Sequence, residues 1–122
     1  MNKLQLAKLR QRIRELKARR NTLEGIAQQH HAMVAASLIE RRFRPGAPPA
    51  YYLSIPGPQN SRHRYVRKQE LEFVRRHSAA WREFGRTMAE WTRANEEIER
   101  LLRRIGKGRC RNVDALLRRK KR

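Results

Sequence analysis

The chain is 122 residues long, the size of one domain, and its mean hydropathy of −0.96 leaves little apolar material for a thick globular core. Its 31 lysines and arginines against 11 acidic residues give a net charge of +20, which favours an anionic partner, nucleic acid first. No apolar run approaches the roughly 18 residues of a membrane-spanning helix, and the single cysteine, Cys110, excludes an intrachain disulfide and a cysteine-based zinc site within one chain.

The first predicted element is a helix over residues 3–30. Apolar residues recur there at steps of three and four, the spacing of a helix face that packs against another helix. These residues are Leu6, Leu9, Ile13, Leu16, Leu23 and Ala27. Gly25 costs about 1 kcal/mol relative to alanine inside a helix. The end of this helix is therefore expected to bend or weaken.

The block at residues 37–67 is predicted to form a small β-element of two or three short antiparallel strands. Three runs with β-branched and aromatic residues are separated by "PGAPP" and "PGPQN". All five prolines of the chain lie in this block, where each removes a backbone donor. We expect the strands to pack on the helix ends through Ile39, Phe43, Leu53, Ile55 and Val66.

Helical periodicity returns over residues 68–105, a length that can lie antiparallel along the first helix. The apolar positions are Leu71, Val74, Trp81, Met88, Trp91, Ile98, Leu102 and Ile105, and we expect both tryptophans to be largely buried. The predicted fold class is mainly α: a long antiparallel helical hairpin with the β-element inserted between its helices. Residues 1–105 form a single predicted domain.

A basic tail follows at residues 106–122. The sequence "GKGRC" is expected to end the second helix, and the remainder offers at most a short helical turn capped by Asn112. The tail has eight basic residues and one aspartate, with little apolar material to bury. We expect it to be mostly disordered when unbound and to contribute affinity for an anion.

The excess positive charge lies outside the second helix, where nine basic residues meet seven acidic ones. In the first helix, Arg10, Arg14 and Lys17 form a basic stripe at steps of three and four beside the apolar face. The stripe has two interpretations, a phosphate-binding surface or a solvated coiled-coil face. Only Glu15 and Glu24 are available in that helix as partners, which favours phosphate binding.

The β-block has six arginines, one glutamate and no lysine before Lys68. Arginine binds phosphates and guanine edges with a planar fork and stacks on bases, although GC-rich coding would also favour it over lysine. The candidate binding residues of the block are Arg41, Arg42, Arg44, Arg62, Arg64, Arg67 and Lys68. Those of the tail are Lys107, Arg109, Arg111, Arg118, Arg119, Lys120, Lys121 and Arg122.

Two adjacent tyrosines, Tyr51 and Tyr52, are further candidates. In a strand their side chains point to opposite faces, so one can pack on the helices while the other stays exposed. The exposed tyrosine has two interpretations, stacking on a nucleic-acid base or packing across the strands against Tyr65.

No catalytic residue, metal site or cofactor is predicted. His30 and His31 are adjacent and therefore diverge on a helix, while His63 and His77 have no carboxylate or cysteine array at ligand spacing. The sequence also has no nucleophile motif and no phosphate-binding glycine loop. We therefore expect no enzyme activity.

The order "AASLIERRFRPGAPPAYYLSI", a turn, "RHRYVRKQELEFVRR" and a long helix resembles a small bacterial and archaeal domain family of unknown function. Members are often encoded in or near transposable elements, so the resemblance implies a mobile-element context. It covers roughly residues 36–100. In the family a cysteine-containing knuckle stands where this chain has "RPGAPPA". Proline rigidity is therefore expected to shape this loop in place of a metal.

These observations predict a non-enzymatic nucleic-acid-binding accessory protein, cytoplasmic and without a membrane partner, that contacts the phosphate backbone of DNA or RNA. Its helices would engage a second copy of the chain or a protein partner, for which a transposase or RNA-guided nuclease fits by analogy. The alternative is a coiled-coil interaction protein that scaffolds a protein or ribonucleoprotein complex without sequence readout.

Overall fold

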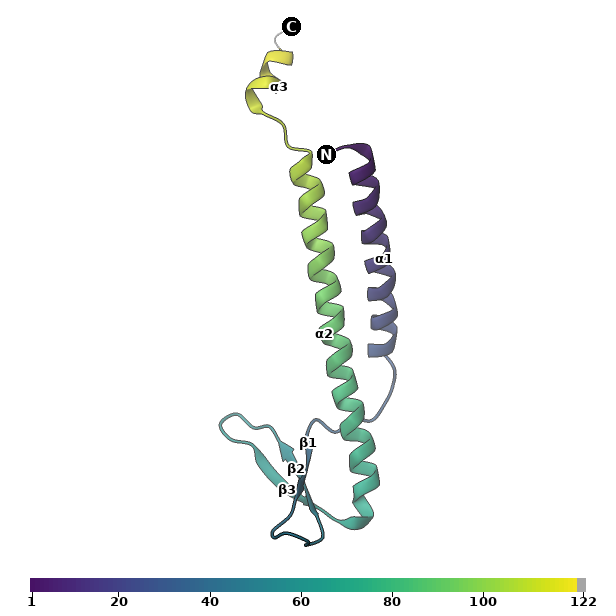
Figure 1. Cartoon of the computed structure of the whole chain (residues 1–122), viewed down its shortest axis with the longest axis vertical. Helices are drawn as coiled ribbons and strands as arrows, with labels where there is room; N and C mark the ends of the chain where they lie inside the picture. Colours follow the sequence, from purple (N-terminus) through teal and green to yellow (C-terminus); the bar gives the residue numbers. More distant parts are fainter. Residues whose placement is uncertain (121–122) are drawn as a thin grey trace. The chain divides into compact units, whose positions relative to one another are not determined.

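The computed structural model describes the backbone of residues 1–120 and the side chains of residues 1–118. Its elements are α1 (Lys3–Ala27), β1 (Ser37–Arg41), β2 (Ala50–Ile55), β3 (Arg62–Val66), the 3-10 turn η1 (Lys68–Glu70), α2 (Leu71–Gly108) and α3 (Val113–Lys120). The fold is mainly α, with a three-stranded antiparallel sheet between the helices (Figure 1). This confirms the predicted fold class.

The chain divides into two compact units, and α2 contributes to both. The helical unit comprises residues 1–26 and 89–122, and the sheet unit comprises residues 27–88. The two hydrophobic cores share no residue. The prediction of one domain over residues 1–105 does not separate these units, because helical periodicity runs along α2 without a break.

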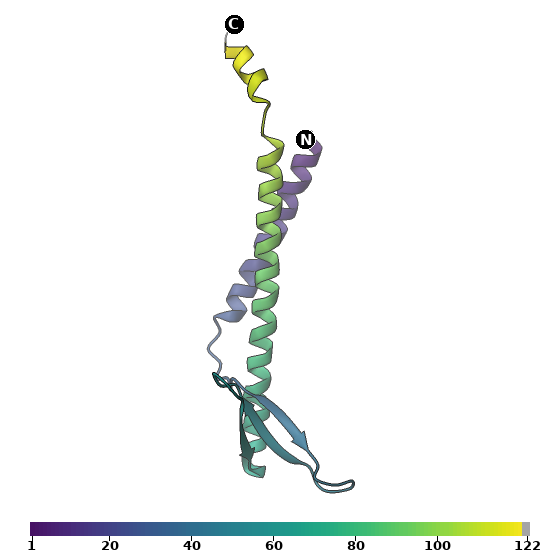
Figure 2. The same cartoon turned by 90° about the vertical axis from the view of Figure 1, so that its left-hand side faces the viewer.

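The core of the helical unit lies between α1 and the last turns of α2 (Figure 1 and Figure 2). Its buried residues are Leu9, Ile13, Leu16, Ile98, Leu101 and Ile105, with Leu6 packed against them. Arg12 contacts Glu97, whereas Glu24, later in α1, contacts Trp91, earlier in α2. This reversed order makes the pair an antiparallel hairpin.

Both predicted apolar faces are correct in outline, with one shift in α2. Leu101 is buried, whereas the predicted Leu102 is 51% exposed. The buried positions Ala94, Ile98, Leu101 and Ile105 follow steps of four, three and four. Leu102 lies about 100° around the helix from Leu101 and falls off this face.

The start of α1 has a local cause. The backbone N–H of Gln5 donates to Oδ1 of Asn2 at 2.8 Å, and the N–H of Asn2 donates to Oε1 of Gln5 at 3.0 Å. This reciprocal cap satisfies two donors at the helix end. The helix ends at Ala27 rather than residue 30, two residues after Gly25, which lowers helix propensity. Further along, Val34 and Ala36 pack in the core of the sheet unit.

The second helix is longer than predicted, ending at Gly108 rather than residue 105. A helical glycine costs only about 1 kcal/mol, and the buried Ile105 holds this turn against α1. The tail, predicted to be mostly disordered, contains α3. Oδ1 of Asn112 accepts the N–H of Ala115 at 3.2 Å, which confirms the predicted cap. The prediction of at most a short helical turn was wrong, because this cap begins a helix of 8 residues.

In the sheet unit, the strands are ordered β1-β2-β3 and lie beside the first turns of α2 (Figure 1). One sheet face, the inner face, contains Leu38, Tyr51, Leu53, Ile55 and Val66, which pack with Ala36, Leu71 and Val74. The hydroxyl of Ser78 donates to the carbonyl of Ala36 at 2.8 Å. The opposite face, the outer face, contains Ile39, Tyr52 and Tyr65 in one cross-strand row.

The packing predictions for this unit are partly wrong. Leu53, Ile55 and Val66 do pack against the helix. Ile39 does not, because the register places it on the outer face, and Phe43 is 70% exposed because it lies beyond the end of β1. Trp81 is 39% exposed and stacks on Phe84 with ring centroids 5.7 Å apart.

Trp91, in the helical unit, is half-buried rather than fully enclosed. Its indole N–H donates to Oε1 of Glu24 at 2.8 Å. The need to satisfy this donor explains why the ring stays at the margin of the core.

Candidate nucleic-acid interface

One flank of the α1–α2 hairpin is neutralised by ion pairs between the helices. Nε of Arg12 lies 3.6 Å from Oε1 of Glu97, and Nη2 of Arg19 lies 2.7 Å from Oε2 of Glu90. At about 100° per residue, these arginines lie on one side of the apolar face of α1 and the basic stripe lies on the other. Glu90 and Glu97 of α2 therefore offset positive charge on the flank that lies away from the stripe.

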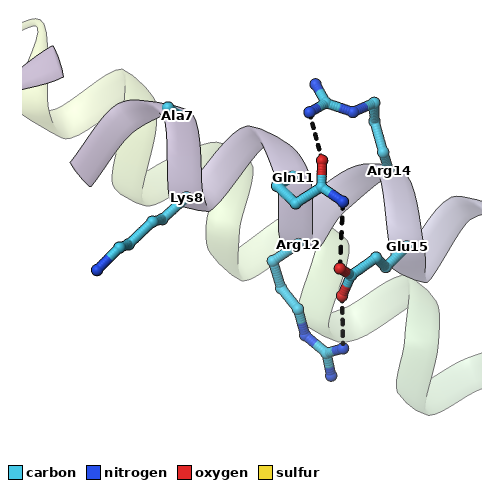
Figure 3. A pocket seen from close by; sticks show the side chains of 6 residues that line it. All are labelled: Ala7, Lys8, Gln11, Arg12, Arg14 and Glu15. Carbon is cyan, nitrogen blue, oxygen red and sulfur yellow. Dashed lines mark hydrogen bonds and ion pairs between the residues drawn. The ribbon is translucent and has the colours of Figure 1, made fainter. Parts of the chain in front are cut away.

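The basic stripe keeps its charge. Figure 3 shows Nη2 of Arg14 bound to Oε1 of Gln11, a neutral partner, at 2.6 Å. Glu15 is engaged elsewhere, because its carboxylate accepts from Gln11 at 3.3 Å and lies 3.5 Å from Arg12. The nearest carboxylate in α1 thus does not pair with the stripe.

Residues from three predicted segments meet at an open hollow of about 360 Å³ in the helical unit. The hollow is lined by Arg10, Arg14 and Arg109 together with Ile13, Leu102, Ile105 and Gly106. Its lining contains three guanidinium side chains and no carboxylate. Guanidinium forks around a concave apolar floor suit a phosphate group, which can accept from more than one arginine. We call this site the arginine hollow.

In the β1–β2 loop, the "RPGA" stretch forms a type II turn. The N–H of Ala47 donates to the carbonyl of Arg44 at 3.1 Å, and Gly46 has a φ of 79°. Proline before a positive-φ glycine is the sequence that this turn requires. The turn agrees with the prediction that proline shapes the loop.

Two arginines predicted to bind nucleic acid have structural partners in the sheet unit. Arg42 donates to the carbonyl of Ala47 at 2.9 Å and to Glu40 at 3.2 Å, which ties down the loop. Arg64 lies 3.2 Å from Oε2 of Glu70. The remaining predicted cations of this block are exposed: Arg41, Arg44, Arg62, Arg67 and Lys68.

Glu70 caps the 3-10 turn that leads into α2. Its Oε1 accepts the backbone N–H of Arg67 at 3.0 Å. This hydrogen bond is the main cause that lowers the pKa of Glu70, the charge of Arg64 lowers it further, and partial desolvation opposes both. The carboxylate therefore stays ionised and offsets the charge of Arg64, which makes Arg64 a weaker candidate for phosphate than its neighbours.

Tyr51 and Tyr52 lie on opposite faces, as predicted. Tyr51 packs at the inner core with the guanidinium of Arg75 5.8 Å from its ring centroid, so its role is structural. Tyr52 makes the cross-strand contact with Tyr65 that was one of the two interpretations of the exposed tyrosine, with ring centroids 5.6 Å apart at 69°. Tyr65 itself is 57% exposed and was not among the predicted site residues. Its register opposite Tyr52 was the signal that could have identified it.

The tail candidates occupy two places. Lys107 lies in the last turn of α2, and Nη1 of Arg111 donates at 3.3 Å to each of two carbonyls at that helix end, those of Gly108 and Cys110. Arg118 is exposed on α3. The side chains of Arg119 and Lys120, and the whole of Lys121 and Arg122, lie outside the described residues.

The chain matches no known family model, no curated protein and no solved structure. Within residues 1–120, no helix has both the length and the apolar character to cross a membrane. The described part of the chain also shows no group of three histidine, cysteine or acidic side chains placed to hold a metal ion. The arginine hollow brings together three of the predicted binding residues, Arg10, Arg14 and Arg109.

Proposed function

We propose that the protein binds DNA or RNA as a non-enzymatic accessory factor, through arginine and lysine contacts to phosphate. The observation that supports this proposal is the arginine hollow, where Arg10, Arg14 and Arg109 line one site without a carboxylate. A chain with a net charge of +20 attracts a polyanion at long range, and the hollow offers a place where phosphates dock at short range.

The charge arrangement of the hairpin favours one flank of α1 for phosphate binding. Glu90 and Glu97 pair with Arg19 and Arg12 on one flank, so the charges there offset one another and that flank attracts a phosphate backbone only weakly. The basic stripe runs along the other flank of α1 and leads to the hollow. Exposed α3 places further charge beyond Gly108, where it adds sequence-independent affinity.

The proposed setting is the cytoplasm, in association with a mobile genetic element. The support is the order of motifs from "AASLIERRF" to "RHRYVRK", which resembles a domain family found near transposable elements. A transposase or RNA-guided nuclease is the proposed protein partner, by that analogy.

The test compares two triple variants with equal loss of charge. Replacing Arg10, Arg14 and Arg109 with glutamine removes the hollow's guanidinium groups. The control replaces Arg12, Arg19 and Arg103, each of which is paired with a glutamate in the same unit.

Binding of labelled duplex and single strand is measured across salt concentrations. The hollow variant should lower affinity and reduce the salt slope by about 0.9 for each lost contact to B-DNA phosphate. The control should change both quantities less. Equal effects of the two variants would show that the hollow has no special role, and absence of nucleic-acid binding by the wild type would contradict the function itself.

A second candidate function, a scaffold that binds proteins through its helices, is favoured by exposed aromatic residues on α2. Phe73 is 59% exposed and stacks on His77 with centroids 4.0 Å apart, and Trp81 is 39% exposed. Such rings are enriched at protein interfaces. Sedimentation of nuclease-treated protein would reveal self-association, and salt-insensitive protein binding without nucleic-acid retention would favour this candidate.

A further inference from the structure

The outer face of the sheet combines one arginine with aromatic rings and has no acidic residue. Alternation and register place Arg41, Tyr52, His63 and Tyr65 on this face. The only acidic residue of the three strands, Glu40, is paired with Tyr51 and therefore lies on the inner face. The outer face thus carries the positive charge of Arg41 with no carboxylate of the strands to offset it.

The geometry of the two outer tyrosines leaves one ring accessible. Tyr52 is half-buried, because Tyr65 lies against it and the guanidinium of Arg41 is 5.2 Å from its ring centroid. Ala50, the register partner of Arg41, is small and leaves room for this guanidinium to lean over Tyr52. The tyrosine rings meet at 69° and not face to face, and Tyr65 is 57% exposed. A flat group can therefore lie on Tyr65 without displacing Tyr52.

We propose that this outer face binds unpaired nucleobases of a single-stranded nucleic acid, with Tyr65 as the stacking residue and Arg41 as the neighbouring cation. This inference rests on the proposed function and names its substrate class. A base inside a duplex has both faces covered by its neighbours, whereas an unpaired base can stack on an aromatic side chain. A phosphate beside the stacked base then lies near the guanidinium of Arg41 and away from carboxylates, and the exposed ring of Tyr65 favours a nucleic acid, which has bases to stack, over an acidic protein segment.

The test measures the contribution of bases separately from that of phosphates, using the full chain. One probe is a labelled oligothymidylate, and the second is an oligonucleotide of equal length and charge whose sites are abasic. Wild-type protein should prefer the probe with bases by about five- to a hundredfold, the range expected for one stacked base. A duplex of the same length serves as the third probe.

Two variants assign the preference to Tyr65. Tyr65→Leu removes the ring and should abolish most of the preference for the probe with bases, while leaving affinity for the abasic probe and the duplex unchanged. Tyr65→Phe keeps the ring and should retain the preference. A third measurement, photocross-linking of wild-type protein to an oligonucleotide containing iodouracil, needs no variant and should label Tyr65 or Tyr52.

The outcomes separate this inference from the proposed function. Equal affinity for the base-containing and abasic probes, with salt-dependent duplex binding retained, would overturn the stacking site and leave the proposed function standing. Failure to bind any probe would overturn both. If Tyr65→Leu is unfolded by circular dichroism, the abasic comparison and the cross-link decide, and cross-links confined to the helical unit would overturn the assignment.

Discussion

The two units use arginine in different ways. In the helical unit, apolar contacts, ion pairs and the basic stripe occupy separate faces of α1, so stability and charge are decoupled along one helix. In the sheet unit the same functions are interleaved, because alternate residues of a short strand face opposite sides. Arg42 and Arg64 are consequently engaged in structure, while Arg41 lies beside exposed aromatic rings. The number of basic residues therefore sets the net charge, whereas the partners of each side chain decide which of them are available to bind.

The largest expected effect comes from opening a cavity in one of the two cores. Leu16 is 7% exposed, so Leu16→Ala should lower the free energy of unfolding by about 2–5 kcal/mol. Chemical denaturation followed by circular dichroism measures this loss. The matched control is Leu102→Ala, at a side chain that is 51% exposed, which should change stability by no more than about 0.5 kcal/mol.

Leu16→Ala also tests whether the two units open separately. Since the two cores share no residue, hydrogen exchange should accelerate more in α1 than in β2 when Leu16 is truncated. An equal loss of protection in both elements would show that the units open only together.

The next effect concerns a buried hydroxyl in the sheet unit. Ser78 is 1% exposed and donates to the carbonyl of Ala36, so Ser78→Ala leaves that buried acceptor without its partner. We expect a loss of about 1–3 kcal/mol in the free energy of unfolding. Thr87→Ala is the control, because its hydroxyl only bonds back to Glu83 one turn earlier in the same helix at 3.0 Å. Equal effects of the two substitutions would contradict a special role for the Ser78 bond.

A smaller effect, of opposite sign, is expected at the polar margin of the helical unit. Nη1 of Arg20 donates to Asn95 at 3.0 Å, but its buried Nε lacks a hydrogen-bond partner, with the nearest carboxylate oxygen of Glu24 3.9 Å away. Arg20→Met keeps the apolar stem and removes the unsatisfied donor. The free energy of unfolding should stay equal or rise by up to about 1 kcal/mol. A loss of stability in thermal melts would show that the pair with Asn95 outweighs the desolvated Nε.

The smallest expected effect is a pH dependence confined to the sheet unit. The pKa of Glu70 is lowered in the folded protein, so its contribution to stability is present above the ordinary glutamate pKa of about 4.3 and is lost as pH falls through the lowered value. Glu70→Gln should therefore flatten the acid limb of the stability profile. Glu72→Gln removes an equal charge from the next turn and should leave that limb in place. Chemical denaturation at a series of pH values measures this limb, and amide resonances of Arg64 and Arg67 followed by NMR titration report the ionisation of Glu70.

Much of the architecture was determined by local sequence. Repeats at three and four residues specify which face of α1 is buried, since a helix brings such positions to one side regardless of its neighbours. Pro45 and Gly46 specify the type II turn, because their backbone preferences are intrinsic. Asn112 begins α3 by the same local logic. The net charge, and with it the preference for an anionic partner, is also a property of composition alone.

Only the tertiary structure decided which side chains meet. Arg109 belongs to the tail by sequence, yet it lines the same hollow as Arg10 and Arg14, because the antiparallel hairpin brings the start of α1 to the end of α2. Strand register, set by pairing across the sheet, decided that Tyr52 rather than Tyr51 is the tyrosine that meets Tyr65. Hydrogen bonds and ion pairs require atoms within about 3–4 Å, and periodicity gives a side chain's direction but not its distance from residues elsewhere in the chain.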